Sequence, residues 1–270
     1  MKNENDITFE PLLGAHDPSP YEILNQDSNT PLLLICDHAS NRIPEKLDNM
    51  GLSEKELSYH IALDIGAAGV TRALSKKLDA PAVLCNYSRL VIDCNRQPGD
   101  PSSIPQISDG ITVPANHCLS ESQQVERSEA VFWPYHHAIT ETGAHLWRKG
   151  TPPALFSIHS FTPELMSRTE DRPWHIAILW KRDPRLASPL IEILSRKTGL
   201  IVGDNVPYSG WEDAYSIDLH GAAPGLPYCA IELRQDLIDT PKKQQEWGDI
   251  LSNALLEIFK DRSIFNVKHY

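Results

Sequence analysis

Short apolar runs that alternate with helical segments limit this chain to the α/β class of folds. The runs are bounded by polar turns, which is typical of buried strands, and they cover residues 31–36, 80–86, 87–93, 154–160, 174–180, 200–202 and 228–233. Apolar residues recur at helical spacing in a segment that ends at Leu78 and in residues 120–149, 186–198 and 244–259. This alternation predicts one α/β domain over residues 31–270 with a largely parallel sheet.

Local signals refine this outline. Ser53 followed three residues later by Glu56 is a capping box and predicts a helix start. Pro134 predicts a break or bend in the helix that begins near residue 120. Residues 1–30 are rich in Asp, Asn, Ser and Pro without periodicity, so we expect an irregular surface arm. Residues 97–118 form a long loop by the same criterion, and such loops are often functional lids.

Charge and cysteine content exclude several classes of function. The net charge is −11, whereas general nucleic-acid and membrane-surface binders present a basic face. The five cysteines have no paired spacing, which favours free thiols in a reducing compartment. Residues 1–10 do not resemble a signal peptide, and no apolar run is long enough to cross a membrane. We therefore expect a cytoplasmic protein; these features leave its oligomeric state open.

Polar side chains stand at or near the ends of the apolar runs, where open α/β sheets bind ligands. They are His38, the cluster Asp93-Cys94-Asn95-Arg96, His159 and Glu232, and Asp64 lies in the first helical region. A lone histidine beside a strand is more often a hydrogen-bonded core residue than a ligand. The polar residues around His38 (Asp37, Ser40 and Asn41) have an alternative role as caps of the following turn.

Glu232 is harder to explain as an ordinary core residue. A carboxylate within an apolar strand is almost never fully buried unless it is paired. It is therefore either a general base or a member of an internal ion pair with Arg89 or Arg234.

Two histidines, one carboxylate and a separate glutamate form the constellation of a hydrolytic zinc site. Three protein ligands leave one position for water, the metal lowers the pKa of that water, and the glutamate takes its proton. The compact motif His-Glu-x-x-His is absent, and so are the Gly-x-Ser-x-Gly elbow and the glycine-rich nucleotide loops. Cys36 and Cys94 offer a thiol nucleophile, but buried free cysteines are common.

Six segments carry a more specific signal. They are residues 36–44 (CDHASNRIP), 60–67 (HIALDIGA), 87–96 (YSRLVIDCNR), 157–163 (SIHSFTP), 202–208 (VGDNVPY) and 231–236 (IELRQD). In content and order they resemble the N-formylglutamate amidohydrolase family. The resemblance implies a three-layer α/β/α fold like that of the zinc carboxypeptidases and cell-wall amidases, with a central, mostly parallel mixed sheet. It also implies one zinc ion and hydrolysis of a carbon–nitrogen amide bond.

The resemblance also suggests roles for individual residues. The family pattern makes His38 and His159 metal ligands, and Glu232 matches the catalytic glutamate. The third ligand is Asp64 by similarity to the cell-wall amidases, or Asn41 by similarity to the carboxypeptidases. Because an amide is a poorer zinc ligand than a carboxylate, we expect Asp64.

Substrate contacts follow from the same comparison. The motif Asp93-x-Asn95-Arg96 is similar to the carboxylate-binding element of related zinc deacylases, in which a guanidinium clamps a substrate carboxylate. The alternative is that the arginines form salt bridges with Asp93 and other acids. His220 is expected to donate to the substrate carbonyl oxygen. The expected substrate-binding residues are Arg89, Asn95, Arg96, Arg234 and Asn41.

The expected protein is a zinc-dependent amidohydrolase that removes a formyl or short acyl group from a small, carboxylate-bearing amino acid. Two alternatives stay open. One is a cell-wall peptide amidase, although the absence of a signal peptide speaks against it. The other is a non-catalytic small-molecule-binding protein that kept the fold.

Overall fold

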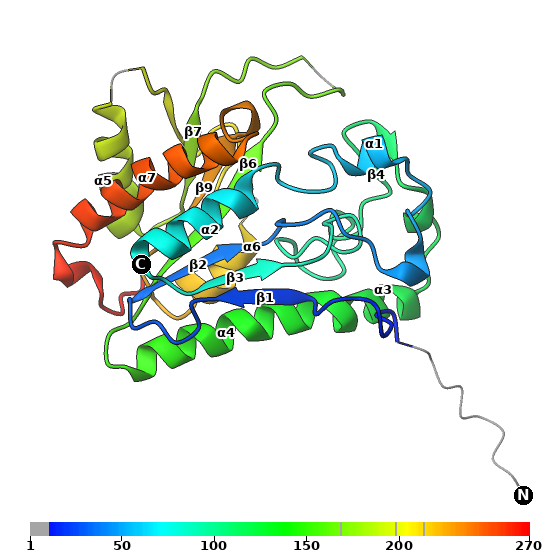
Figure 1. The fold of residues 1–270 in the computed structure, drawn as a ribbon, viewed down its shortest axis with the longest axis horizontal. Coiled ribbons are helices and arrows are strands. Elements are labelled where there is room, and N and C mark those ends of the chain that lie inside the picture. Colours follow the sequence, from blue (N-terminus) through cyan, green and yellow to red (C-terminus); the bar gives the residue numbers. More distant parts are fainter. Residues whose placement is uncertain (1–10, 168, 198, 213) are drawn as a thin grey trace, which may run out of the picture.

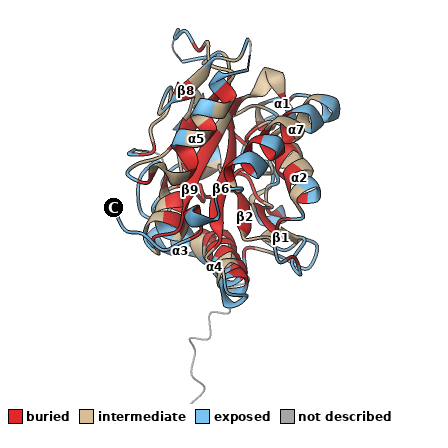
Figure 2. Cartoon of the chain, turned by 90° about the vertical axis from the view of Figure 1, so that its left-hand side faces the viewer, coloured by how far each residue is buried: buried red, intermediate tan, exposed pale blue. Residues whose placement is uncertain are grey.

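A mixed sheet forms the centre of the molecule and is covered by helices on both faces (Figures 1 and 2). The computed structural model describes residues 11–167, 169–197, 199–212 and 214–270, so the expectation for residues 1–10 lies outside it. In the described part of the chain, the sheet has seven strands in the order β1-β3-β2-β6-β9-β7-β8. Their bounds are β1 Tyr21–Leu24, β2 Leu32–Cys36, β3 Ala82–Cys85, β6 Ala154–Phe161, β7 Ile176–Leu179, β8 Val202–Asp204 and β9 Tyr228–Arg234. The predicted three-layer α/β/α fold is confirmed.

The inner strands run parallel and the sheet is antiparallel at two places. β3, β2, β6 and β9 are parallel neighbours, whereas β1 is antiparallel to β3 and β7 is antiparallel to β9. β2 and β6 are buried along their whole length. A strand covered on both faces has no solvent side, which explains why these runs are continuously apolar rather than alternating.

The sheet divides the core into two apolar clusters, one on each of its faces, and helices cover both. Figure 1 shows α2, α5 and α7 on one side and α4 on the other. The helix bounds are α1 Glu54–Leu57, α2 Ala67–Leu78, α3 Glu121–Arg127, α4 Trp133–Arg148, α5 Pro184–Ser195, α6 Tyr215–Ile217 and α7 Pro241–Ile258. The capping box of Ser53 and Glu56 is present at the start of α1, as predicted. Among the described residues, no helix combines the length and apolar character needed to span a bilayer.

Pro134 does not break a helix. α3 continues through a π-helical turn, Ser128–Phe132, directly into α4, and Pro134 occupies the first turn of α4. The π turn ends with the Trp133 N–H donating to the carbonyl of Ser128, so the regular helical pattern of hydrogen bonds is already interrupted directly before Pro134, where the missing N–H is tolerated.

Two further expectations are corrected. Within the expected irregular arm, residues 21–24 form β1, which pairs with β3 at the edge of the sheet. Residues 87–93 form turns rather than a strand, although Leu90, Val91 and Ile92 are buried. Side chains replace a neighbouring strand there: Asn116 donates to the carbonyl of Leu90, and Arg127 donates to that of Val91.

The expected loop at residues 97–118 contains regular structure. β4 Ile107–Ser108 and β5 Ile111–Thr112 form a small antiparallel hairpin, and a 3₁₀ turn follows at Pro114–Asn116. The helical segment expected before Leu78 begins only at Ala67, so Asp64 lies in the connection that leads into α2.

Candidate metal centre and active site

Two histidines and one aspartate meet near the carboxyl ends of β2 and β6. His38 follows β2, His159 lies near the carboxyl end of β6, and Asp64 stands shortly before α2. All three are buried, and each offers one ligand atom within 4.8 Å of the others. Oδ2 of Asp64 lies 3.2 Å from Nδ1 of His38 and 2.8 Å from Nδ1 of His159. The structure therefore brings together the three residues expected to hold a metal ion.

The backbone fixes Asp64 in this position. Its N–H donates to the carbonyl of His38 over 3.0 Å, and its Oδ2 accepts from the backbone N–H of Ser160 over 3.3 Å. Gly66 then turns the chain into α2 with a φ of 82°. A Cβ at Gly66 would lie 2.2 Å from the carbonyl oxygen of Ile238, so both the backbone angle and the available space require glycine.

Two further carboxylates hold the other nitrogen of each histidine. Oδ1 of Asp93 lies 2.7 Å from Nε2 of His38, and Oδ2 of Asp37 lies 3.1 Å from Nε2 of His159. Oδ1 of Asp37 accepts from the hydroxyls of Tyr135 and Ser216 over 3.0 and 2.7 Å. Metal-binding histidines usually have such a carboxylate behind them, because it fixes the ring and its tautomer.

Sequence analysis missed these two roles. It interpreted Asp37 as a turn cap and placed Asp93 in a substrate-binding motif. The requirement of a metal-binding histidine for an acidic partner was the signal that pointed to them.

The electrostatics of the group favour a cation. Burial alone would lower the pKa of His159, but Asp37 and Asp64 raise it well above its usual value. Burial alone would raise the pKa of Asp37, but His159 brings it down to about 2. Three buried carboxylates (Asp37, Asp64 and Asp93) face one guanidinium, that of Arg89, which donates to both Asp93 and Asp64. If a metal ion displaced the protons of both histidines, these three carboxylates and the guanidinium would carry a net charge of two negative units, which one divalent cation balances.

Glu232 lies beside this group on the neighbouring strand. It is paired with His159 in the parallel register of β6 and β9, which places the two backbones roughly 5 Å apart. Its Oε2 is buried and has no hydrogen-bond partner among the described residues. Burial raises the pKa of Glu232 to about 7. Arg234 pairs with Asp236 instead, so the alternative of an ion pair with Arg234 is not what the structure shows.

A cavity of about 380 Å³ opens next to the group and includes two of the three arginines expected to bind substrate, Arg89 and Arg96. Residues 97–118 contribute part of its wall. The lining residues are His60, Ile61, Arg89, Asp93, Arg96, Ser102, Pro105, Ser108, Asp109, Leu165, Ser167 and Tyr208.

Three residues expected to contact substrate, Asn41, Asn95 and Arg234, form hydrogen bonds within the protein. The amide of Asn41 donates to the carbonyl of Leu57 at the end of α1, and Asp64 rather than Asn41 lies with the two histidines. Oδ1 of Asn95 accepts from the backbone of Ser216. Arg234 donates to Asp236 and to the carbonyls of residues 172 and 173.

Among the described residues, no hydrogen bond or ion pair joins His220 to His38, Asp64 or His159. It lies in a π-helical turn, Asp218–Ala222, and lines a different cavity beside Leu33 and Leu155. Leu155 precedes His159 by four residues along β6, roughly 13 Å of extended strand. The chain after α6 returns along the sheet toward the amino ends of the strands, which is why sequence alone misplaced this side chain.

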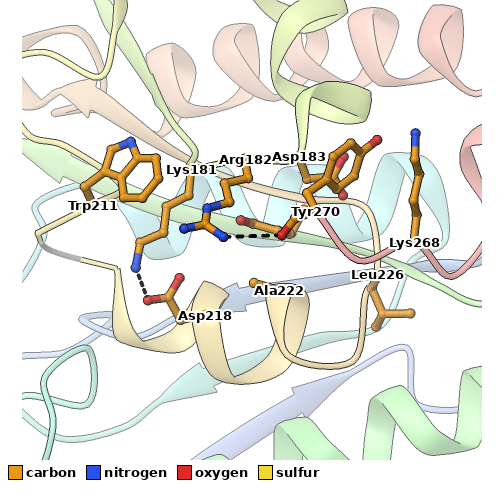
Figure 3. A pocket seen from close by; sticks show the side chains of 10 residues that line it. Lys181, Arg182, Asp183, Trp211, Asp218, Ala222, Leu226, Lys268 and Tyr270 are labelled. Atoms are coloured by element: carbon orange, nitrogen blue, oxygen red, sulfur yellow. Dashed lines mark hydrogen bonds and ion pairs between the residues drawn. The ribbon is translucent and has the colours of Figure 1, made fainter.

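A further cavity, of about 320 Å³, is lined by Lys181, Arg182, Asp183, Trp211, Asp218, Ala222, Leu226, Tyr228, Lys268 and Tyr270 (Figure 3). Its charges are partly matched within the protein, because Lys181 contacts Asp218 and Asp183 pairs with Arg185. It contains none of the three residues that could hold a metal ion, His38, Asp64 and His159, which we call the metal-binding group.

Comparison with known proteins agrees with this geometry. The family model for N-formylglutamate amidohydrolase matches residues 30–239. The structure is similar to that of the gene product Atu2144 from Agrobacterium tumefaciens, with a TM-score of 0.89 and 33% identity over 93% of this chain and 99% of that chain. It shares its fold with N-formylglutamate amidohydrolase from Ralstonia eutropha, with a TM-score of 0.65 and 17% identity over 91% of this chain and 99% of that chain. No curated protein matches the chain. The chain belongs to the N-formylglutamate amidohydrolase family and is a hydrolase of carbon–nitrogen amide bonds.

Proposed function

We propose that this protein is a zinc-dependent amidohydrolase that removes a formyl or short acyl group from an amino acid bearing a free carboxylate. The observation that carries the proposal is the placement of Glu232. Its carboxylate has an unpartnered oxygen and lies beside two histidines and an aspartate that converge on one point.

His38, Asp64 and His159 fit a zinc ion. Nitrogen and carboxylate oxygen are ligands that zinc prefers, and three protein ligands leave a position for water or substrate. Asp93 and Asp37 stand behind the two histidines, as the outer partners of zinc ligands do. A bound zinc ion would lower the pKa of a water molecule and polarise the carbonyl of the scissile amide.

Glu232 would move the protons of the reaction. With a pKa of about 7 it exchanges a proton readily near neutral pH. As a carboxylate it accepts a proton from the attacking water, and as a carboxylic acid it donates that proton to the departing amine nitrogen. Burial keeps Oε2 away from competing donors of the protein.

Arg89 and Arg96 would bind the carboxylate of the substrate. Both line the cavity next to the metal-binding group. Three hydrogen bonds of Arg89 go to Asp93 and Asp64, which use three of its five N–H groups and hold the guanidinium in place. The remaining N–H groups offer a fixed donor pair to an anionic substrate.

Substitution of Glu232 by Gln tests the proposal. The amide preserves the shape of the side chain but cannot accept a proton, so turnover should fall by about 10²- to 10⁴-fold. Zinc content, measured by elemental analysis, should stay at one ion per chain. The matched control is Glu192→Gln on the exposed face of α5, which should leave turnover unchanged. Full activity of E232Q would refute the role of Glu232, and a purified protein without stoichiometric zinc would favour a non-catalytic relative.

A panel of N-formyl and N-acyl amino acids would define the substrate. We expect hydrolysis of N-formyl and N-acetyl compounds whose side chain or main chain carries a carboxylate, and loss of activity when that carboxylate is amidated. We also place the enzyme in the cytoplasm, since all five cysteines are free and the neighbouring thiols of Cys85 and Cys94 form no disulfide.

A further inference from the structure

An apolar cavity of about 540 Å³ lies between α4 and the π-helical turn Asp218–Ala222, apart from the metal-binding group. Leu33 and Leu155 of the sheet, with Ile139 and Ala144 of α4, form part of its wall. We call it the α4 cavity. Its volume is within the roughly 300–1,000 Å³ of small-molecule sites, which are also mostly apolar.

The rim of the α4 cavity exposes large apolar side chains. Trp147 is 37% exposed and Leu219 is 39% exposed, and both line the opening. No Asp, Glu, Lys or Arg is among the described residues that line the cavity. A charged ligand would lose its hydration there without gaining a counter-ion, so the cavity selects neutral molecules.

Four polar side chains interrupt the apolar wall, those of His136, His137, Thr140 and His220, and two of them contact each other. The ring planes of His136 and His220 are nearly parallel, 14° apart, and Nδ1 of His136 lies 2.8 Å from Nε2 of His220. Nε2 of His136 lies 2.9 Å from the carbonyl oxygen of Cys94.

The positions of the protons follow from this chain of hydrogen bonds. A carbonyl oxygen only accepts, so Nε2 of His136 is the donor to Cys94 and Nδ1 of the neutral ring is an acceptor. His220 must then donate from Nε2, which leaves its Nδ1 without a proton. Burial, and then His136, lower the pKa of His220 to about 3, consistent with a neutral ring. Among the described residues, none forms a hydrogen bond with Nδ1 of His220.

We propose that the α4 cavity binds a neutral, largely apolar small molecule that donates one hydrogen bond, from a hydroxyl or N–H group, to Nδ1 of His220. The apolar walls supply contact area, and His220 supplies a polar contact that orients the ligand. This site is separate from the amidohydrolase site, because the two cavities share no lining residue.

The test compares 2-naphthol with 2-methoxynaphthalene, in which a methyl group replaces the hydrogen-bonding proton of the hydroxyl. Their affinities for the full-length protein are measured by isothermal titration calorimetry, with and without a chelator, so that binding of naphthol to a metal ion is recognised. We expect 2-naphthol to bind about three- to tenfold more tightly, the ratio that one neutral hydrogen bond provides. The ratio of the two affinities should be the same in the presence of the chelator.

Three variants locate the site. His220→Phe keeps a ring but removes the acceptor, so the two affinities should become equal. Ala144→Phe fills the cavity and should weaken both compounds at least tenfold. Leu256→Ala removes an exposed apolar side chain of α7 and should change neither affinity.

Several results would overturn the proposal. They are the absence of saturable binding, equal affinities of the two compounds for the wild-type protein, and a donor preference that survives in His220→Phe. Sedimentation analysis that shows a dimer, together with the absence of binding of either compound, would also overturn it, because a second copy of the chain would then cover the α4 cavity. The comparison of the two compounds on the wild-type protein holds even where a variant fails to fold.

Discussion

Asp37 and Asp93 show how single residues orient the side chains of the metal-binding group. Each carboxylate contacts the histidine nitrogen that faces away from Asp64. The ring of each histidine is thereby held so that Nδ1 points at the shared oxygen of Asp64. The geometry of the group consequently depends on residues that would never touch the ion.

Replacement of Asp37 by Asn tests this dependence. The amide keeps the size of the side chain but loses the charge behind His159, so zinc affinity should fall by about 10- to 100-fold. Competition with a chromogenic chelator measures it. Asp183→Asn is the control, because Asp183 is equally buried but caps α5 and pairs with Arg185. Equal zinc affinities of D37N and D183N would contradict the role of Asp37.

The raised pKa of Glu232 leads to a prediction about how the stability of the protein depends on pH. Burial raises this pKa from 4.5 to about 7 in the folded protein. The contribution of this pKa difference to the free energy of unfolding is fully present below about pH 4.5. It is lost as the pH rises through about 7, because the buried carboxyl group must then ionise. In the metal-free protein, the unfolding free energy of E232Q relative to wild type should therefore rise by about 2–3 kcal/mol between about pH 4 and pH 8. Urea denaturation in a chelator measures the trend, and a difference independent of pH would contradict it.

Residue identity was predictable where chemistry limits the choice. Zinc ligands and a proton acceptor come from few residue types, so His38, Asp64, His159 and Glu232 were expected and lie together. His220 was misplaced because a polar residue in a long loop has no periodicity that fixes its direction.

At the scale of elements, the start of α2 links the fold to the site. Gly66 begins the helix two residues after Asp64, in a left-handed conformation and against the carbonyl of Ile238. This close approach also brings the chain that follows β9 against α2. The connection cannot move without moving Asp64.

Gly66→Ala should therefore damage both stability and metal binding. The new Cβ would meet backbone that cannot move aside, and we expect a loss of more than about 2 kcal/mol in unfolding free energy together with weaker zinc binding. Gly69→Ala is the control in the same helix. Its Cβ meets only the end of the flexible Gln244 side chain, so the unfolding free energy should change by less than about 1 kcal/mol. Denaturant titration and chelator competition check both variants, and a benign Gly66→Ala would contradict the argument.

Elements were predictable where periodicity and burial agree. β2, β6 and β9 follow their apolar runs closely. Residues 87–93 also form an apolar run, but the side chains of Asn116 and Arg127 satisfy carbonyls that a neighbouring strand would otherwise bind. Such distant partners are not visible in a local pattern.

At the scale of the whole molecule, the ion would couple parts of the chain that are far apart. His38, Asp64 and His159 come from three separate segments, and unfolding would separate them. Zinc at about 100 times its Kd should raise the unfolding free energy by about 2.7 kcal/mol, or the Tm by about 5–10 °C for a chain of this size. Differential scanning calorimetry with and without chelator measures the shift. An unchanged Tm would argue against a zinc site formed by distant segments.

The position of β9 has a consequence for synthesis of the chain. This strand lies between β6 and β7, which both precede it in the sequence. A polypeptide emerging from the ribosome therefore contains His38, Asp64 and His159 long before Glu232 is translated. Its sheet stays open in the middle until residue 234 has left the exit tunnel. Nascent chains of this protein would thus acquire the capacity to capture an ion first and the capacity to hydrolyse an amide last.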